Sequence, residues 1–441
     1  MTRIFSVPFG RGTAKFTAPP WACVASVETR AFPAAADPCQ TIARALANPI
    51  GCAPLSVLAQ GKRNVCIAVT DATRLCPDHL LVPPMLRELD LAGVPTTSVT
   101  ILVAVGTHRK STDQEKREKL GDDIVDRYQV IDHDPYDPDE LRDSGVSIDG
   151  VPVFLSRYVL EADLVLATGR VEPHQYAGYS GGGKTVAIGC AAEPVIGHTH
   201  GPAMLDRPRV RLGVLNGNPF QEAVREVAAA AHVAFVANCV LDDDGRLVAA
   251  GYGSPAAVQD LLAQTAERMY VASIPGQVDI AVAGVGYPKD QNAYQASRAA
   301  SYLQYAPTPV VRSGGVIIVP AACPEGPGEG VGEQRFFAAM TGEEGRAAFL
   351  ARVRAGDFQP GEQRAYIMAQ ILDDVTVIFA GAADPGPLNA MGFQTAAGLD
   401  EAWEMAGANV GQPATALVVP HALLTMPVVT PAVHLGSPGN D

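Results

Sequence analysis

The sequence predicts an α/β protein: two α/β domains with mainly parallel sheets. Apolar runs as long as a buried strand alternate with stretches in which apolar residues recur at helical spacing. This alternation is typical of parallel sheets covered by helices. The chain has 441 residues, 47% of them hydrophobic, which is enough for more than one core. We therefore expect an N-terminal domain over residues 1–272 and a C-terminal domain over residues 273–441.

The elements of the first domain follow one another in order. The clearest buried strand is 64–70 (NVCIAVT), and the next, 98–105, is also largely apolar. Further strands are predicted at 128–132, at 161–168 and as a pair within 233–252, and helices at 39–47, 80–92, 113–120 and 216–232.

A predicted helix at 255–269 followed by Pro275-Gly276 is typical of a domain connection. The strand–helix pattern then begins again, and we expect a second sheet of about four or five strands. The last ~15 residues are expected to be a loose tail. The predicted strands are 278–284, 315–320, 374–380 and 415–420, with helices near 289–305, 333–355, 361–372 and 398–408.

Composition argues against several classes of function. The net charge of −14 argues against general binding to nucleic acid or to an anionic membrane surface. No run reaches the ~20 apolar residues of a membrane span, and the first residues lack the apolar core of a signal peptide. The eight cysteines include no C-x-x-C pair, so neither a zinc site nor a disulfide framework is indicated. We expect a cytoplasmic protein with reduced thiols.

Three loops rich in polar residues follow predicted strands. They are 71–77 (DATRLCP), 106–112 (GTHRKST) and 169–184. Ligands of parallel α/β sheets collect at the carboxyl ends of the strands. We therefore expect these loops to lie together and to form a site.

The segment 178–185 (GYSGGGKT) matches the phosphate-binding loop of nucleotide hydrolases in letters but not in context. That loop leaves its strand directly and begins a long helix. Here several residues, including Pro173 and His174, separate the strand from Gly178, and little room for a helix follows. A different phosphate cradle fits better, with Lys184 as counter-charge or covalent anchor. An ATP- or GTP-using enzyme remains the alternative.

Several side chains on these loops have two possible roles. Arg74 could bind a carboxylate or phosphate through two nitrogens, whereas Asp71 and Thr73 could cap the following helix. His108 could act as a base or only pack against its neighbours. His174 lies on a loop, where a purely structural histidine is less expected.

Two further groups are candidates. His198 and His200 alternate, so one could face a ligand while the other points away. One histidine makes a poor metal site, so a metal here would need most of its ligands from a bound organic group. Gln295 and Arg298 lie one turn apart on a predicted helix and could offer an amide and a guanidinium to an acid substrate, or form ordinary helix surface.

Taken together, the motifs D-x-T-R-x-x-P at 71–77, G-T-H-R at 106–109, E-P-H-x-x-A-G-Y-S-G-G-G-K at 172–184, His200 and N-x-Y-Q-A at 292–296 resemble those of the lactate racemase family. They cover most of the chain in order. The resemblance implies a cofactor-binding N-terminal domain, a C-terminal domain that contributes substrate-binding residues, and an active site in the cleft between them. It also implies a nickel-pincer nucleotide, Ni(II)-pyridinium-3,5-bisthiocarboxylic acid mononucleotide, supplied by cofactor-synthesising or cofactor-delivering proteins.

The resemblance implies a role for each candidate residue. Lys184 corresponds to the lysine that tethers the nucleotide, and His200 to the protein ligand of nickel. His108 and His174 correspond to the two acid/base residues. The remaining implied contacts are Asp71, Ala72, Thr73 and Arg74 to the cofactor, and Arg74, Tyr294, Gln295 and Arg298 to the substrate.

The implied reaction is racemisation or epimerisation of a 2-hydroxy acid. A histidine that titrates near ~6.5 is too weak a base to remove a proton from Cα beside a carboxylate. It can instead remove the hydroxyl proton while hydride passes from Cα to the cofactor and then returns to either face of a flat 2-keto acid.

Two positions depart from the family pattern. Arg298 stands where lactate-acting members have lysine, and Phe358 where they have tryptophan. Because both changes are on the substrate side, lactate itself is uncertain, and a larger 2-hydroxy acid, including a sugar acid, fits. A catalytically silent relative that stores or delivers the cofactor is the second alternative.

Overall fold

The computed structural model describes residues 3–358 and 361–430. The chain forms two compact units, Ala31–Met269 and a second unit of Met1–Arg30 with Tyr270–Asp441. Each unit contains a six-stranded sheet whose strands are mainly parallel and carry helices between them. The fold class predicted from the sequence, two α/β units with mainly parallel sheets, is confirmed.

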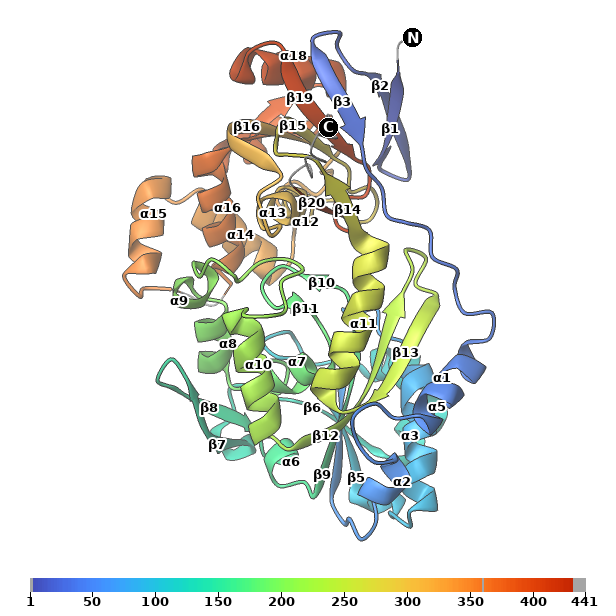
Figure 1. Ribbon diagram of the computed structural model, residues 1–441. Helices are drawn as coiled ribbons and strands as arrows, with labels where there is room; N and C mark the ends of the chain where they lie inside the picture. Colours follow the sequence, from blue (N-terminus) through green and yellow to red (C-terminus); the bar gives the residue numbers. More distant parts are fainter. Residues whose placement is uncertain (1–2, 359–360, 431–441) are drawn as a thin grey trace, which may run out of the picture. The chain divides into compact units, whose positions relative to one another are not determined.

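The sheet of the 31–269 unit has the strand order β13-β12-β9-β4-β5-β6. Figure 1 labels β5, β6, β9, β12 and β13 of this sheet. All neighbours in it are parallel except β12 and β13, which pair antiparallel. Its strands are β4 (Val65–Thr70), β5 (Val99–Ala104), β6 (Gln129–Asp132), β9 (Leu164–Arg170), β12 (Val233–Leu241) and β13 (Leu247–Gly253).

Helices cover both faces of this sheet because its side chains alternate between the faces. Ile67 and Phe235 point into a core shared with Met85 of helix α3 (Asp78–Leu91). Val236 and Asn238 point to the other face, where α7 (Gly182–Ala187) lies against the strands. The remaining helices and hairpins of the unit are α1 (Pro38–Ala47), α2 (Leu55–Leu58), α4 (Asp113–Leu120), α5 (Asp122–Arg127), α6 (Arg157–Leu160), α8 (Glu193–Thr199), α9 (Pro202–Leu205), α10 (Pro219–Ala230), α11 (Pro255–Tyr270), β7 (Leu141–Ile148) with β8 (Val151–Ser156), and β10 (Pro173–His174) with β11 (Gly178–Tyr179).

The sheet of the second unit is parallel throughout, in the order β18-β17-β16-β15-β19-β3. The sequence suggested four or five strands here and placed residues 1–30 in the other domain. The structure differs because β3, close to the N-terminus, pairs with β19 and completes this sheet. Its strands are β3 (Ala22–Ser26), β15 (Val278–Ala283), β16 (Val311–Pro320), β17 (Thr376–Ala380), β18 (Gln394–Ala396) and β19 (Ala414–Val419).

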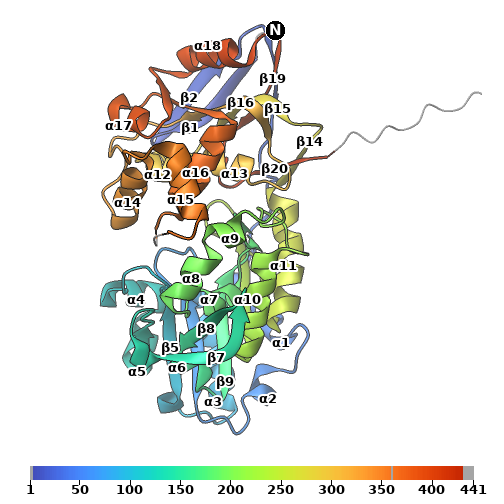
Figure 2. The same cartoon turned by 90° about the vertical axis from the view of Figure 1, so that its left-hand side faces the viewer.

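Helix α18 (Leu399–Val410) and the hairpin of β1 (Ile4–Phe9) and β2 (Gly12–Thr17) share one core on this sheet, where Phe16 contacts Trp403. Helices α13 and α16 pack against strands of the same sheet, and α13 also packs against α16 (Figure 2). The predicted helices at 289–305 and 333–355 are each divided in two. The helices are α12 (Ala293–Ala296), α13 (Arg298–Gln304), α14 (Val331–Met340), α15 (Gly345–Arg354), α16 (Gln363–Asp374) and α17 (Pro385–Ala390), and a short ladder joins β14 (Val271–Ile274) to β20 (Met426–Val429).

Two expectations concern the ends and the surface of the chain. Most of the predicted loose tail, residues 431–441, lies outside the described residues. Among the residues that the structure describes, every helix is too short or too polar to cross a bilayer.

Candidate active site

The three polar loops leave neighbouring strands at the same edge of the sheet. Strands β9, β4 and β5 are adjacent and parallel, so their carboxyl ends lie side by side. The loop 71–77 follows β4, the loop 106–112 follows β5, and the glycine-rich segment follows β9. The strand topology therefore brings these loops together, as parallel pairing predicts.

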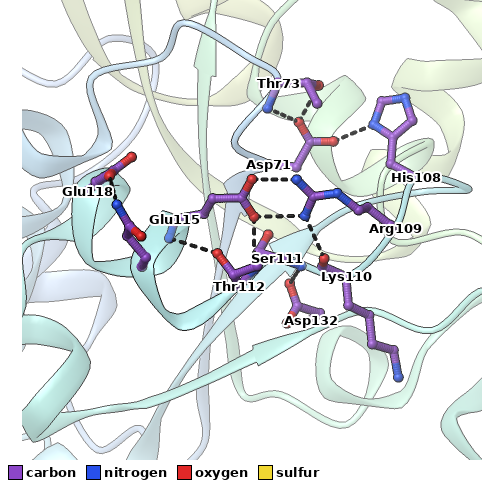
Figure 3. Close-up of polar contacts among 11 residues, drawn as sticks. Asp71, Thr73, His108, Arg109, Lys110, Ser111, Thr112, Glu115, Glu118 and Asp132 are labelled. Carbon is purple, nitrogen blue, oxygen red and sulfur yellow. Dashed lines mark hydrogen bonds and ion pairs between the residues drawn. The ribbon is translucent and has the colours of Figure 1, made fainter. Parts of the chain in front are cut away.

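His108 and Asp71 form a close pair across two of these loops (Figure 3). The distance between Nδ1 of His108 and Oδ2 of Asp71 is 2.5 Å. The side chain of Asp71 is 6% exposed, whereas that of His108 is 44% exposed, so the histidine is accessible and the carboxylate is not. Arg109, the next residue, turns instead to Glu115 of α4, with a shortest separation of 2.5 Å between the two groups.

The environment keeps Asp71 ionised. Burial alone would raise its pKa, but the hydrogen bond and charge of His108, with contributions from Thr73 and Arg74, lower the pKa of Asp71 to about 2. An ionised carboxylate only accepts hydrogen bonds, so Nδ1 of His108 carries a proton, and in the neutral ring Nε2 holds the lone pair. The pair therefore fixes His108 in the tautomer of a base.

The sequence left open whether Asp71 and Thr73 cap the next helix. In the structure Asp71 accepts hydrogen bonds from the backbone N–H and hydroxyl of Thr73, at 2.9 and 2.6 Å. Helix α3 begins later, at Asp78, and no side chain that the structure describes caps it. Asp71 shapes its own loop. Ala72 and Arg74 lie exposed on that loop.

Lys119 of α4 donates hydrogen bonds to the backbone of the 71–77 loop. The sequence did not predict this role. Nζ of Lys119 donates to the carbonyl oxygens of Arg74 and Cys76, at 2.7 and 3.1 Å. The same Nζ lies 3.1 Å from Oδ2 of Asp78, whose side chain is fully buried. No sequence pattern signals this contact, since two of its acceptors are backbone carbonyls.

The glycine-rich segment does not have the form of a nucleotide-hydrolase loop. Helix α7 has six residues, and the backbone N–H of Gly182 already donates to the side-chain carbonyl of Asn238 at 2.9 Å. The hydroxyl of Thr185 donates to the carbonyl of Thr168 at 2.8 Å. In a phosphate loop these groups would face phosphate and magnesium. Their internal bonds argue against the ATP- or GTP-using alternative.

Close backbone packing positions Lys184. A Cβ added to Gly169, in β9, would lie 2.4 Å from the backbone nitrogen of Gly182, so only glycine permits this approach. Lys184 follows in the first turn of α7 and is partly buried. Burial, and secondly the charge of Arg74, lower the pKa of Lys184 to about 7, although Asp71 and Glu172 oppose the shift. A substantial fraction of this amine is therefore neutral and nucleophilic near neutral pH.

His200, at the end of α8, is held as a neutral imidazole. Its Nδ1 lies 3.0 Å from the carbonyl oxygen of Ile196, and its ring packs edge-on against Tyr176 and Phe220. Burial, then the charge of Lys184, lower the pKa of His200 to about 3. Since a carbonyl oxygen accepts, Nδ1 carries the proton and Nε2 holds the lone pair. Metal-binding histidines are commonly oriented by such a bond to the other ring nitrogen.

His174 has the opposite arrangement. Its Nδ1 accepts hydrogen bonds from the backbone N–H groups of Tyr176 and Ala177, at 3.2 and 3.1 Å. In the neutral ring Nε2 therefore carries the proton. His174 also packs against Tyr176 and Phe220, the two rings that contact His200. The two histidines predicted to be acid/bases thus differ in tautomer.

A metal site made of protein ligands alone is not present in the part of the chain that the structure describes. No group of three or more His, Cys, Asp or Glu side chains is placed to hold an ion there. His198 is paired with Asp149, with 3.0 Å between Nε2 and Oδ2. Of this alternating pair, His200 keeps Nε2 as an acceptor and could serve a metal whose other ligands belong to an organic group.

The predicted substrate residues lie together on the α12–α13 segment of the second unit. Asn292 caps α12 by accepting from the backbone N–H of Gln295 at 3.0 Å. Arg298 begins α13 and donates to the hydroxyl of Tyr302 at 3.2 Å, with Oε1 of Gln295 at 3.5 Å. Tyr294, Gln295 and Arg298 are partly exposed on this segment.

Comparison with known proteins identifies the family. Residues 9–213 match the lactate racemase N-terminal domain, and residues 271–426 match the lactate racemase C-terminal domain. The lactate racemase of Lactiplantibacillus plantarum is 33% identical over 390 residues, which cover 87% of this chain and 89% of that protein. The chain belongs to the lactate racemase family.

A second lactate racemase and two solved structures are also similar to this chain. The lactate racemase of Thermoanaerobacterium thermosaccharolyticum is 34% identical over 340 residues, covering 76% of this chain and 78% of that protein. The apoprotein structure from the same organism has a TM-score of 0.86 at 28% identity and covers 97% of this chain and 100% of its own. A Thermotoga maritima protein shares the fold, with a TM-score of 0.62 at 18% identity, over 85% of this chain and 96% of that one. The prediction of a racemase, an isomerase acting on a small molecule, is confirmed.

Proposed function

We propose that the chain is a nickel-pincer nucleotide-dependent racemase or epimerase of a 2-hydroxy acid. The observation that carries the proposal is the pair of His108 and Asp71, in which a buried carboxylate fixes an accessible imidazole as a base. The relatives are lactate racemases. For this chain we keep the wider substrate class, since Arg298 replaces the lysine expected in lactate-acting members. We further infer a cytoplasmic enzyme that receives its cofactor from synthesising or delivering proteins.

The chemistry limits what the histidines can do. A proton on Cα of a 2-hydroxy acid lies beside an anionic carboxylate and is far too weakly acidic for an imidazole of ordinary basicity. The hydroxyl proton is within its reach when the Cα hydrogen leaves as hydride. When bound, the nickel-pincer nucleotide supplies an electron-poor centre that accepts and returns this hydride.

The residues of the 31–269 unit suit this cofactor. Lys184, with its pKa lowered to about 7, would hold the nucleotide covalently. His200 presents the lone pair of Nε2 and would be the single protein ligand of nickel. The loop of Asp71, Ala72, Thr73 and Arg74 would contact the nucleotide, and Arg74 would also contact the substrate carboxylate.

The two histidines would handle protons for opposite enantiomers. His108 is ready to accept the substrate hydroxyl proton at Nε2, and Asp71 stabilises the imidazolium that forms. His174 presents an N–H at Nε2 and donates a hydrogen bond to a substrate oxygen in this arrangement. To act as a base, it must move the proton to Nδ1, which requires release of the two backbone N–H groups that Nδ1 now accepts.

Production of the chain together with cofactor-synthesising enzymes tests the proposal. Ultraviolet-visible spectra, nickel analysis and the mass of the peptide that contains Lys184 report on the cofactor. Chiral chromatography then follows racemisation of a panel of 2-hydroxy acids. The expected result is nickel with an added mass on Lys184 and interconversion of the enantiomers of at least one acid.

Substitutions separate the roles. His108→Ala and His174→Ala should each abolish racemisation while the added mass on Lys184 and the nickel remain. Activity retained in either variant would refute the role of that histidine. A cofactor-loaded chain without activity on any 2-hydroxy acid would favour a protein that stores or delivers the cofactor. Tight ATP binding without nickel would refute the proposal.

A further inference from the structure

Arg364, in the first turn of α16, forms no ion pair with any residue that the structure describes. Its Nε and Nη1 are buried and have no hydrogen-bond partner among residues 3–358 and 361–430. Its guanidinium carbon lies 5.0 Å from the ring centroid of Tyr294. Arg354 offers a comparison, because it lies 5.7 Å over the ring of Tyr366 and its Nε also donates to the hydroxyl of Tyr366 at 3.0 Å.

The buried N–H groups of Arg364 need a hydrogen-bond acceptor. Nearly all buried N–H groups in folded proteins have one, and a charged group loses more than a neutral one when it is desolvated without a partner. The face of Tyr294 attracts the positive charge but accepts no hydrogen bond from the edge of the guanidinium. The N–H groups of Nε and Nη1 point from different edges of the guanidinium, so each calls for its own acceptor, and a charged carboxylate oxygen is a stronger acceptor than a neutral one.

The position of Arg364 links it to the substrate segment. Tyr294 lies between Arg364 and Phe336 of α14, whose ring meets that of Tyr294 edge-on at 5.5 Å. Helix α14 packs against both α12 and α16, and α16 packs against α13, which begins with Arg298 (Figure 2). The cation therefore contacts the same segment that carries the predicted substrate residues Tyr294, Gln295 and Arg298.

We propose that Arg364, stacked on Tyr294, binds a second anionic group of the substrate, and that the substrates are 2-hydroxy dicarboxylic acids. A 2-hydroxy monocarboxylate has one negative charge, which the predicted contacts already assign to Arg74 and Arg298. It leaves Arg364 without an acceptor, whereas a second carboxylate supplies one. This inference rests on the proposed function and deepens it by naming the substrate class.

A matched pair of substrates tests the inference in the cofactor-loaded enzyme. 2-Hydroxybutanedioate and 2-hydroxybutanoate have the same number of carbons and differ in the terminal carboxylate. The wild type should prefer the dicarboxylate. Arg364→Gln should lower kcat/KM for the dicarboxylate by about 10- to 100-fold and change that for the monocarboxylate by less than about threefold. Arg364→Lys should restore part of the loss, because it returns the charge without the planar guanidinium and its fixed N–H directions.

Binding to the cofactor-free protein gives a second, independent measurement. Calorimetric titration with 2-hydroxybutanedioate should show tighter binding to the wild type than to Arg364→Gln. Arg354→Gln, which removes an arginine stacked on a different tyrosine, should keep the wild-type preference. Circular dichroism establishes that each variant is folded.

The outcomes distinguish the two proposals. Equal use of both acids by the wild type, or an equal loss for both acids in Arg364→Gln, overturns the inference and leaves the racemase proposal standing. If the loaded enzyme racemises neither acid, the titration decides: binding of the dicarboxylate that depends on Arg364 supports the anion site, and equal binding by wild type and variant overturns it.

Discussion

Nδ1 of His108 lies 2.5 Å from Oδ2 of Asp71, although 37 positions separate the two residues in the chain. Asp71 follows β4 and His108 follows β5, so the contact arises from the parallel pairing of these neighbouring strands. The carboxylate is buried and its pKa is lowered to about 2, so it stays ionised over the range in which histidine titrates. Asp71 therefore determines which nitrogen of His108 can act as a base.

Asp71→Asn tests this relationship. An asparagine of nearly the same shape can hold the ring in place, but its amide no longer stabilises a protonated imidazole and can favour the wrong tautomer. We expect kcat to fall by about 10²- to 10⁴-fold while the cofactor remains attached to Lys184. Chiral chromatography and peptide mass measure the two quantities. A loss of less than about threefold in a fully loaded variant would show that Asp71 does not orient the base.

The pKa of Lys184 predicts how the stability of the cofactor-free protein depends on pH. The folded pKa of about 7 lies below the ordinary 10.5, so the unfolded chain binds more protons between these values. The contribution of Lys184 to stability therefore rises with pH across that window. Lys184→Met removes the penalty of a buried charge and should be more stable than the wild type at pH 7, with a difference that shrinks toward about pH 10. Denaturant unfolding measures this, and a less stable variant at pH 7 would contradict the lowered pKa.

His200 and His198 form a matched pair for the nickel ligand. His200→Ala removes the only predicted protein ligand, so nickel per attached nucleotide should fall strongly while the added mass on Lys184 remains. His198→Ala should keep its nickel, because His198 is bonded to Asp149, which also pairs with Arg207 at 2.7 Å. Metal analysis beside peptide mass gives the ratio. If the two variants retain equal nickel, His200 is not the protein ligand of the metal.

The parts of the fold that depend on local pattern could be predicted from the sequence. The apolar runs of β4, β5 and β9 lie close to their predicted positions, and the parallel-sheet rule alone indicated that their loops would meet. The N-terminal strand β3 could not be assigned to its sheet. It is short and only partly buried, and its partner β19 lies near the other end of the chain.

The sequence also could not predict those details of the site that depend on backbone atoms. His174 and His108 are both histidines on loops, but the first accepts from two backbone N–H groups and the second donates to a carboxylate. Sequence motifs record side chains and not the direction of neighbouring peptide groups. For the same reason the contact of Lys119 with the 71–77 loop could not be predicted, because its acceptors include the carbonyls of Arg74 and Cys76.

A comparison of Lys119 with Lys116 measures what the hydrogen bonds from Lys119 to the 71–77 loop contribute. Both lie on α4 and both form largely buried ion pairs, Lys119 with Asp78 at 3.1 Å and Lys116 with Asp132 at 2.5 Å. Replacing either lysine with methionine leaves a buried carboxylate unpaired, which costs about 3–5 kcal/mol of unfolding free energy. Lys119 alone also bonds to the carbonyls of the 71–77 loop.

The two variants should therefore lose similar stability but differ in activity. Below the unfolding transition, Lys119→Met should have a kcat/KM lower than that of Lys116→Met by about tenfold or more, because a loosened loop no longer holds Asp71 against His108. Hydrogen exchange should be faster in residues 71–77 of Lys119→Met only. If both variants are equally active when folded, Lys119 contributes stability alone, and the position of Asp71 is set by β4 and by the bonds from Thr73.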